Sequence, residues 1–269
     1  MTATGVIPDI VLVVFFIYTS RISLADSVDI IKVRMLAFCY LVGWSVELMV
    51  DKKITPNIQV FDQIAPGWYN FRHYSIFTPE LEMLAKRWKN GMLLNLGSGH
   101  GADFLPFKDH FELYGVDFSR EMIRMARRYS QKFGLAPKLV VADISRLPFS
   151  DDSFDWAISV ATYHHLQGRE NQLAALIELK RVLKSGGEAF ITVWNRCQPH
   201  FWFKRKEVAV PWRTGGKVIY RYYYLFTYGE LEDRVKKAGF TILKSFPEHS
   251  YNLPVKYLSR NICLLIKKP

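Results

Sequence analysis

The chain has 269 residues, of which 49% are apolar, 15% aromatic and 23% charged, and its formal net charge at pH 7 is +11. This composition excludes a disordered or collagen-like chain, and the length fits one large α/β domain, or one domain with an extension. A domain of this size needs no disulfide or structural metal to fold. Cys39, Cys197 and Cys263 are odd in number and lack the spacing of zinc ligands, which predicts free thiols in a reducing, cytoplasmic compartment and no metal site.

The positive charge is concentrated near the C-terminus. Residues 1–52 carry a net charge of −1 and residues 53–195 carry +2, whereas residues 196–269 carry +10 and also hold 14 aromatic residues. Basic residues interleaved with aromatic ones favour a surface that binds a nucleic-acid backbone and its bases, and residues 196–224 are the first candidate for it. The alternative is that these aromatics are core residues and that the Lys and Arg side chains only keep the protein in solution.

The first 52 residues contain two apolar runs, residues 10–18 and 35–46. Each is shorter than the roughly 20 residues that a membrane-spanning helix needs, and residues 1–8 lack the basic start of a signal peptide. The segment therefore fits an interfacial or packing extension, a weak membrane anchor, or sequence upstream of the natural start. We predict that the folded domain comprises residues 53–269.

From about residue 54 onward, short apolar strands alternate with amphipathic helices. The predicted strands are residues 92–96, 113–116, 138–142, 154–160, 188–194, 241–246 and 261–266. Thr78, Ser119 and the capping box Thr227-x-x-Glu230 predict the starts of three helices, and residues 169–183 form a fourth. Ser185-Gly186-Gly187 predicts a turn before the fifth strand. Repeated β–α units predict a Rossmann-like α/β fold, with a seven-stranded, mostly parallel sheet and helices on both faces.

A glycine loop follows the first predicted strand directly. It reads Gly97-Ser98-Gly99-His100-Gly101, and its glycines let the backbone approach a ligand closely. Asp117 follows Gly97 by 20 residues and ends the second strand, where a carboxylate can accept both hydroxyl groups of an adenosine ribose. Asp143 ends the third strand, where it can accept from an adenine amino group. The loop and the two aspartates therefore predict a site for an adenosine-bearing cofactor at the carboxyl ends of the strands.

Nicotinamide cofactors and S-adenosylmethionine (SAM) both present adenosine to such a loop. The GxGxG pattern lacks the third glycine of GxGxxG, and no basic residue follows it to meet a pyrophosphate, which favours SAM. Leu147-Pro148-Phe149, Phe154-Asp155 and Leu183-Lys184-x-Gly186-Gly187 then occur in order, and with them residues 57–195 resemble the class I SAM-dependent methyltransferases. The predicted SAM-binding residues are Tyr69, Arg72, Gly97, Ser98, Gly99, Gly101, Asp117, Phe118, Asp143, Ile144, Ser159 and Val160.

A closer resemblance covers roughly residues 57–266. Its motifs are VFDQIAP from Val60, ISVA from Ile158 with a following HHL, VPW from Val210, RYY from Arg221 and GEL from Gly229. Together they are similar to the tRNA wobble-uridine carboxymethyl methyltransferases. The resemblance implies methyl transfer to a carboxymethyl group on uridine 34 of tRNA, and a small zinc-binding activator protein as a partner. The chain departs from the family in its GSG loop, where GCG is usual, and in a short insert before the last helix.

Methyl transfer to a carboxylate is an in-line displacement, and the nucleophile is already ionised near neutral pH. The enzyme therefore has to align the reacting atoms and exclude water, and it needs no strong base. The predicted catalytic residues are His164 and His165 past the fourth strand, Arg213 as a cation for the carboxylate, and Trp194 as a ring that stacks on uracil. Arg72 is a second candidate cation, and Tyr69 is expected to close over the methionine end of SAM.

Two other functions stay open at this point. One is methylation of a small apolar metabolite, such as a quinone or a lipid, with residues 1–52 as a membrane contact. The other is a non-catalytic scaffold that keeps the fold. The intact set of Gly97, Gly99, Asp117 and Asp143 argues against a scaffold, because a protein without catalysis does not need it.

Overall fold

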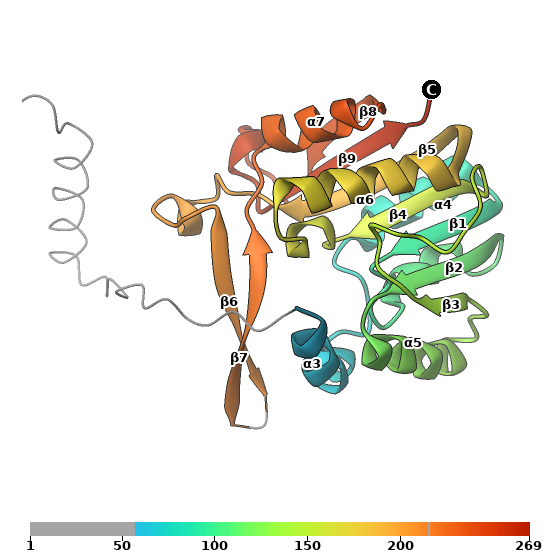
Figure 1. Cartoon of the computed structure of the whole chain (residues 1–269), viewed down its shortest axis with the longest axis horizontal. Coiled ribbons are helices and arrows are strands. Elements are labelled where there is room, and N and C mark those ends of the chain that lie inside the picture. The colour runs from blue at the N-terminus through green and yellow to red at the C-terminus, as the bar shows by residue number, and fades with distance from the viewer. Residues whose placement is uncertain (1–56, 215) are drawn as a thin grey trace, which may run out of the picture. The chain divides into compact units, whose positions relative to one another are not determined.

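The computed structural model describes residues 57–214 and 216–269, and the predicted extension 1–52 lies outside the described residues. The elements, in chain order, are α3 (Asn57–Phe71), α4 (Thr78–Trp88), β1 (Gly91–Leu96), η2 (Ala102–Phe107), β2 (Phe111–Asp117), α5 (Arg120–Phe133), β3 (Lys138–Val141), β4 (Phe154–Val160), η3 (Tyr163–His165), α6 (Arg169–Val182), β5 (Leu183–Trp194), η4 (Pro199–Phe201), β6 (Glu207–Thr214), β7 (Lys217–Tyr224), α7 (Tyr228–Lys237), β8 (Thr241–Pro247), η5 (Lys256–Leu258) and β9 (Asn261–Lys267) (Figure 1). None of the helices in these ranges is long and apolar enough to span a bilayer.

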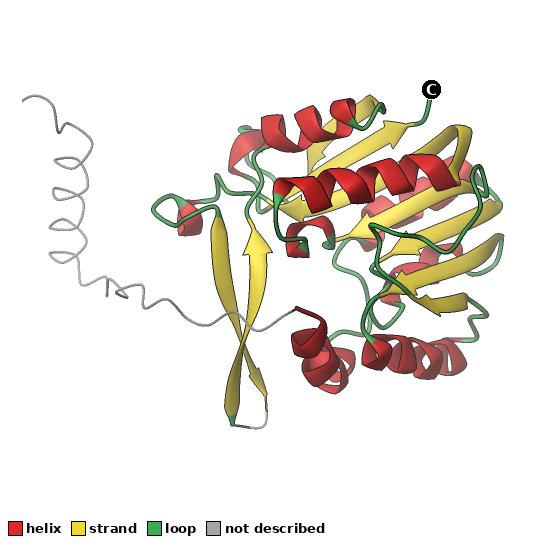
Figure 2. Ribbon diagram, viewed as in Figure 1, coloured by secondary structure: helices red, strands yellow, loops and turns green. Residues whose placement is uncertain are grey.

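The central sheet has seven strands in the order β3-β2-β1-β4-β5-β9-β8. The first five are parallel, and β9 and β8 are antiparallel to their neighbours (Figure 2). This confirms the predicted fold class. The strand order reverses between β1 and β4, so the carboxyl ends of these strands border the crevice where ligands bind in open α/β sheets.

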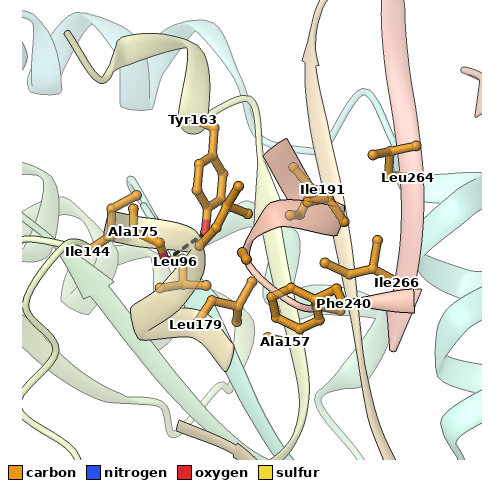
Figure 3. Packing of buried hydrophobic residues seen from close by; sticks show 14 of the residues in the cluster. Leu96, Ile144, Ala157, Tyr163, Ala175, Leu179, Ile191, Phe240, Leu264 and Ile266 are labelled. Atoms are coloured by element: carbon orange, nitrogen blue, oxygen red, sulfur yellow. Dashed lines mark hydrogen bonds between the residues drawn. The ribbon is translucent and has the colours of Figure 1, made fainter. Parts of the chain in front are cut away.

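Each face of the sheet is covered by helices. Side chains of α6 and α7 pack with the sheet in one apolar cluster, and side chains of α3, α4, η2 and α5 pack in a second. In the first cluster, Leu96, Ala157 and Ile191 of the strands are fully buried with Leu179 of α6 (Figure 3). Tyr163 enters the same cluster, and its hydroxyl donates to the carbonyl of Ala175 at 3.2 Å.

The packing of α6 makes a prediction about stability. Leu179→Ala is expected to lower the free energy of unfolding by about 2–5 kcal/mol, because it removes a fully buried side chain and leaves a cavity. Ile177 lies on the same helix but is 51% exposed, so Ile177→Ala should change that free energy by less than about 1 kcal/mol. Urea denaturation of both variants measures the difference, and equal losses would contradict the assigned faces of α6.

Most of the predicted helix and strand boundaries are confirmed to within a few residues. The Ser119 hydroxyl accepts from the Met122 amide at the start of α5, and the Thr227–Glu230 capping box is present in α7. The prediction for Thr78 was wrong: it lies in the first turn of α4, and its hydroxyl donates to the Ser75 carbonyl, so it caps no amide.

The predicted turn at residues 185–187 was also wrong. β5 runs continuously from Leu183, and the chain absorbs the extra residues as a register shift against β4 between Phe154 and Trp156. A Cβ atom on Gly187 would lie 2.8 Å from the Asp155 carbonyl oxygen, so the close approach of the two strands requires glycine here.

The sequence did not predict the β6–β7 hairpin, which stands beyond the carboxyl ends of the parallel strands (Figures 1 and 2). Its burial also revises the basic and aromatic segment 196–224. Tyr222, Tyr223 and Tyr224 are less than 10% exposed and Arg221 is 6% exposed, so these residues belong to the interior. The surface aromatics of this segment are Trp202 and Phe203, which lie before the hairpin.

Candidate active site

A cavity of about 560 Å³ opens at the carboxyl ends of β1, β2 and β4, between the glycine loop, α3 and the β6–β7 hairpin. It brings together most of the predicted site residues: Arg72, Gly97, Ser98, Gly99, Asp117, Phe118, Asp143, Ile144, Val160, His164, His165 and Trp194. Four predicted residues do not line it: Tyr69, Gly101, Ser159 and Arg213.

The glycine loop forms one wall of the cavity. The amides of Gly97 and Ser98 both donate to the Val116 carbonyl, at 2.8 and 2.9 Å. Gly97 and Gly99 have φ angles of +69° and +52°, in the left-handed region that favours glycine. A Cβ atom on Gly97 would collide with Thr162 at 2.3 Å, whereas one on Gly99 would meet nothing within 4 Å. Gly97 therefore serves packing, and Gly99 leaves the backbone open towards a ligand.

Asp117 is the buried carboxylate beside this loop. Its Oδ2 accepts from the Gly99 amide and its Oδ1 from the Ser119 amide, both at 2.9 Å. Burial raises the pKa of Asp117 to about 6, the two amide donors oppose this rise, and the nearby Asp62 adds to it. Asp62 accepts from the Ser119 hydroxyl at 2.6 Å, so it ties α3 to the start of α5. The carboxylate is thus held in place and can take further donors, such as ribose hydroxyl groups.

The adenine side of the predicted cofactor site lies next to it. Asp143 is exposed, and its Oδ1 accepts from both the amide and the hydroxyl of Ser145, each at 2.8 Å. Its Oδ2 can therefore accept from an amino group. Ile144 is buried and Phe118 packs edge-on against Phe61, and both line the cavity, so they offer an apolar slot for a flat ring.

His100 connects the glycine loop to the end of α3. Its Nε2 lies 2.7 Å from the Arg72 carbonyl oxygen, and because a carbonyl only accepts, Nε2 carries the proton. Burial lowers the pKa of His100 to about 4, so the ring is neutral at neutral pH. Arg72 itself lies over the Trp68 ring at 5.2 Å, and burial lowers its pKa. Arg72 thus places a cation beside the glycine loop. Sequence reasoning did not assign His100 to the site, although this residue stands within the glycine motif.

The two adjacent histidines have different surroundings in the acceptor half of the cavity. Nδ1 of His164 accepts from the Trp194 amide at 3.2 Å, while Nδ1 of His165 donates to the Tyr222 carbonyl at 3.0 Å. Burial lowers the pKa of His164 well below its ordinary value and that of His165 to about 3, so both rings are neutral at pH 7. The neutral His164 therefore carries its proton on Nε2, and its ring stacks on Tyr223 at 4.7 Å.

Arg221 of β7 is a buried cation that sequence reasoning did not assign to the site. Its guanidinium lies over three rings, at 5.2 Å from Trp212, 5.2 Å from Tyr223 and 5.6 Å from Trp68. Within the described residues it forms no ion pair with a carboxylate. Burial of an unpaired cation is costly, and aromatic faces offset only part of that cost. The sequence carried two signals for it: an arginine set among tyrosines, and its place at the start of the RYY motif.

Three buried nitrogen donors in this half of the cavity have no hydrogen-bond partner among residues 57–214 and 216–269. They are Nε of Arg221, Nε1 of Trp212 and Nε2 of His164, and all three residues line the cavity. Nearly all buried donors in folded proteins are paired, so a group of unpaired ones indicates a ligand that accepts hydrogen bonds. The arrangement fits an oxygen-rich anion next to the cofactor.

The four predicted residues that do not line the cavity lie on the surface or have packing and hydrogen-bonding roles within the protein. Arg213 directly follows Trp212 in β6, and because side chains alternate along a strand, it lies on the opposite face and is exposed. Tyr69 is buried and packs edge-on against His100 and Tyr129. The Ser159 hydroxyl donates to the Leu96 carbonyl at 3.2 Å, and Gly101 precedes η2 with a φ of +91°.

Comparisons of the sequence with known proteins point to one kind of enzyme. The family model described as a methyltransferase domain matches residues 94–191. The human protein named "Probable tRNA methyltransferase 9B" is 27% identical over 76% of this chain and 41% of that protein. The tRNA (carboxymethyluridine(34)-5-O)-methyltransferase of Schizosaccharomyces pombe is 28% identical over 72% of this chain and 90% of that protein. A protein of Encephalitozoon cuniculi named "Putative methyltransferase" is 30% identical over 58% of this chain and 72% of that protein.

The chain spans less than half the length of the mammalian relatives that it matches. Solved structures share its fold at lower identity. A SAM-dependent methyltransferase from Clostridium acetobutylicum has a TM-score of 0.61 at 16% identity, over 78% of this chain and 96% of that chain. A chain from the "Complex between the Haloferax volcanii Trm112 methyltransferase activator and the putative methyltransferase" has a TM-score of 0.56 at 18% identity, over 78% of this chain and 97% of that chain.

Proposed function

Because the chain belongs to the class I SAM-dependent methyltransferases, we propose that it methylates the carboxylate of a modified wobble uridine in tRNA. The name of the S. pombe relative, of which the chain covers 90%, supports this acceptor. The net charge of +10 in residues 196–269 supports a polyanionic substrate. A small activator protein is proposed as a partner, by analogy with the Haloferax volcanii complex.

The observation that carries the proposal is the set of unpaired donors around Arg221. A carboxymethyl uridine offers a carboxylate and two ring carbonyls as acceptors, and these match one buried cation and two further N–H groups. A quinone has carbonyl oxygens that could accept from the two neutral donors, but neither a quinone nor a neutral lipid headgroup has an anion, so either would leave the Arg221 guanidinium buried without a counter-ion. The site therefore favours the nucleotide over the apolar metabolite.

The residues of the cavity fit SAM at one end and the acceptor at the other. SAM supplies an electrophilic methyl group on its sulfonium when it is bound. Asp117 and Asp143 would hold its ribose and adenine, and Arg72, beside the glycine loop, would hold its methionine carboxylate. Arg221 would orient the acceptor carboxylate, and the neutral His164 would donate from Nε2 without adding charge that weakens the nucleophile.

The experiment incubates the full chain with methyl-labelled SAM and either bulk tRNA or a lipid extract. Label is expected in tRNA, and mild alkali should release it as methanol, because methyl esters hydrolyse whereas methyl groups on bases or ribose remain. Label in the lipid extract alone would contradict the proposed acceptor, and alkali-stable label in tRNA would contradict a carboxylate as the nucleophile.

The raised pKa of Asp117 predicts how SAM binding depends on pH. Only the ionised carboxylate accepts both ribose hydroxyls, and burial puts its pKa at about 6. The dissociation constant for SAM should therefore be constant above about pH 7 and rise roughly tenfold per unit as the pH falls below 6. Titration calorimetry from pH 5 to 8 measures this, and Asp117→Asn should bind weakly with a flat profile. The same steep profile in Asp117→Asn would assign the titration to another group.

A further inference from the structure

Two segments that are distant in sequence lie side by side next to the cavity. We call residues 196–206 and 251–260 together the rim surface. Asn195 is fully buried and its Nδ2 donates to the carbonyls of Tyr257 and Ser259, at 2.8 and 2.7 Å. Gln198 donates to the Arg260 carbonyl at 3.2 Å, which joins the two segments a second time. The rim surface is thus one continuous part of the protein.

This surface begins at the wall of the cavity. β5 and β9 pair in antiparallel register with Trp194 opposite Asn261, so both segments leave the sheet at the same edge. Trp194 lines the cavity, and its ring centroid lies 5.9 Å from that of Phe201 in the rim surface. Arg260 is close enough to Arg72 that its positive charge helps to lower the pKa of Arg72. A polymer that places one residue in the cavity therefore meets the rim surface with the residues next to it.

The rim surface is strongly basic. Its 21 residues include no Asp or Glu and six basic residues: Arg196, Lys204, Arg205, Lys206, Lys256 and Arg260. Among the described residues, only Lys206 of these six forms an ion pair, with Glu230. The neighbouring Glu248 is buried, and it accepts from the backbone amides of Arg260 and Asn261. Five cations are therefore left to meet an anionic partner.

Aromatic rings are exposed among these cations. Trp202, Phe203 and Tyr257 are 54%, 59% and 56% exposed. The Trp202 ring is held in place by a hydrogen bond of 2.7 Å from its Nε1 to the Cys197 carbonyl. Lys256 lies over the Tyr257 ring at 5.2 Å. Rings of fixed orientation with cations beside them suit bases and phosphates of a single strand.

We propose that the rim surface binds the single-stranded nucleotides that flank the reacting nucleotide, with Trp202 stacking on a base and Arg205 and Arg260 contacting phosphates. This inference rests on the proposed function. A nucleotide that enters the cavity leaves the stack of its neighbours, and an exposed ring replaces the lost stacking partner. A lipid surface is a weaker match, because cations are spread among the apolar side chains instead of being kept to a polar border.

The test compares two rim variants with a charge-matched control. The rim variants are Trp202→Ala and the double variant Arg205→Ala/Arg260→Ala, and the control is Lys108→Ala/Lys236→Ala, whose lysines are exposed on η2's end and α7. The probe is an unmodified anticodon stem–loop RNA, followed by fluorescence anisotropy at several salt concentrations. Trp202→Ala should weaken binding about tenfold. The arginine double variant should lower the slope of log K against log salt by about 1.4, and the control should leave both quantities unchanged.

Two results would overturn the proposal. One is RNA binding and salt dependence in both rim variants that equal those of the parent chain. The other is unchanged RNA binding together with loss of binding to vesicles of anionic phospholipid, which would assign the surface to a membrane. The proposed function fails separately: it fails if the parent chain does not label tRNA, whereas labelling of tRNA by the parent and by both rim variants alike removes only the rim proposal.

Discussion

Replacing Arg221 with glutamine is expected to lower kcat/KM for the tRNA acceptor by about 100-fold or more, while SAM binds as tightly as in the parent chain. The reason is that Arg221 is a buried cation in the acceptor half of the cavity. The residues assigned to SAM are the glycine loop, Asp117, Asp143 and Arg72. Arg221→Lys keeps the charge but loses the planar group that fits the rings and a carboxylate. Its kcat/KM should therefore lie between those of the parent chain and Arg221→Gln.

Arg213→Gln is the matched control for this experiment. It removes the same charge from the same hairpin, but its side chain is exposed and lies outside the cavity, so kcat/KM should change by less than about threefold. Steady-state kinetics with saturating SAM give the comparison, and thermal unfolding with calorimetry of SAM binding shows that each variant is folded. A large loss of kcat/KM in Arg213→Gln with a small loss in Arg221→Gln would reverse the assignment. Arg213 would then be the cation for the acceptor carboxylate, as expected from the sequence.

The second large effect is expected at Asp117. Asp117→Ala should raise the dissociation constant for SAM by about 100-fold or more, because two charge-assisted hydrogen bonds to the ribose are lost at about 1.5 kcal/mol or more each. The same substitution frees the Gly99 amide, which donates to Asp117 at 2.9 Å, so the loop also loses a contact that holds it.

Glu112→Gln provides the control for Asp117→Ala. Glu112 lies on the same strand, β2, but at its far end, where it pairs with Lys138 on the surface. The SAM affinity of Glu112→Gln should equal that of the parent chain when both are measured by calorimetry at pH 7.5. Retention of SAM affinity in Asp117→Ala would mean that the adenosine lies elsewhere, and the cofactor assignment would then be wrong.

The cofactor half of the cavity was predictable because its determinants are local. A glycine loop directly follows a strand, and Asp117 and Asp143 end the next two strands, so parallel packing alone brings them to one edge. The acceptor half depends on the register of a hairpin that the sequence did not predict. A shift of one residue in β6 exchanges the faces of Trp212 and Arg213, and the choice between Arg213 and Arg221 rests on that alternation.

Besides the register of the hairpin, the burial of its aromatic residues could not be predicted from composition. The run Tyr220–Tyr224 and the run at residues 201–203 are both aromatic and stand beside basic residues, yet Tyr222 and Tyr224 join the apolar cluster under α6 and α7 while Trp202 and Phe203 face solvent. β7 packs against α3 and η3, whereas Trp202 and Phe203 lie before β6 and are 54% and 59% exposed. Contacts between elements that are far apart in sequence therefore determine which of these aromatic residues are buried.

The aromatic rings around Arg221 also bear on turnover. Esterification converts an anionic acceptor into a neutral product, so the proposed reaction erases the charge that drew the substrate to the guanidinium. The rings of Trp68, Trp212 and Tyr223 stay in contact with the guanidinium after the anion has been neutralised. They lower the free-energy cost of a buried cation that has no counter-ion. In the proposed reaction the ester is therefore expected to be held less tightly than the acid, which would couple product release to the chemistry.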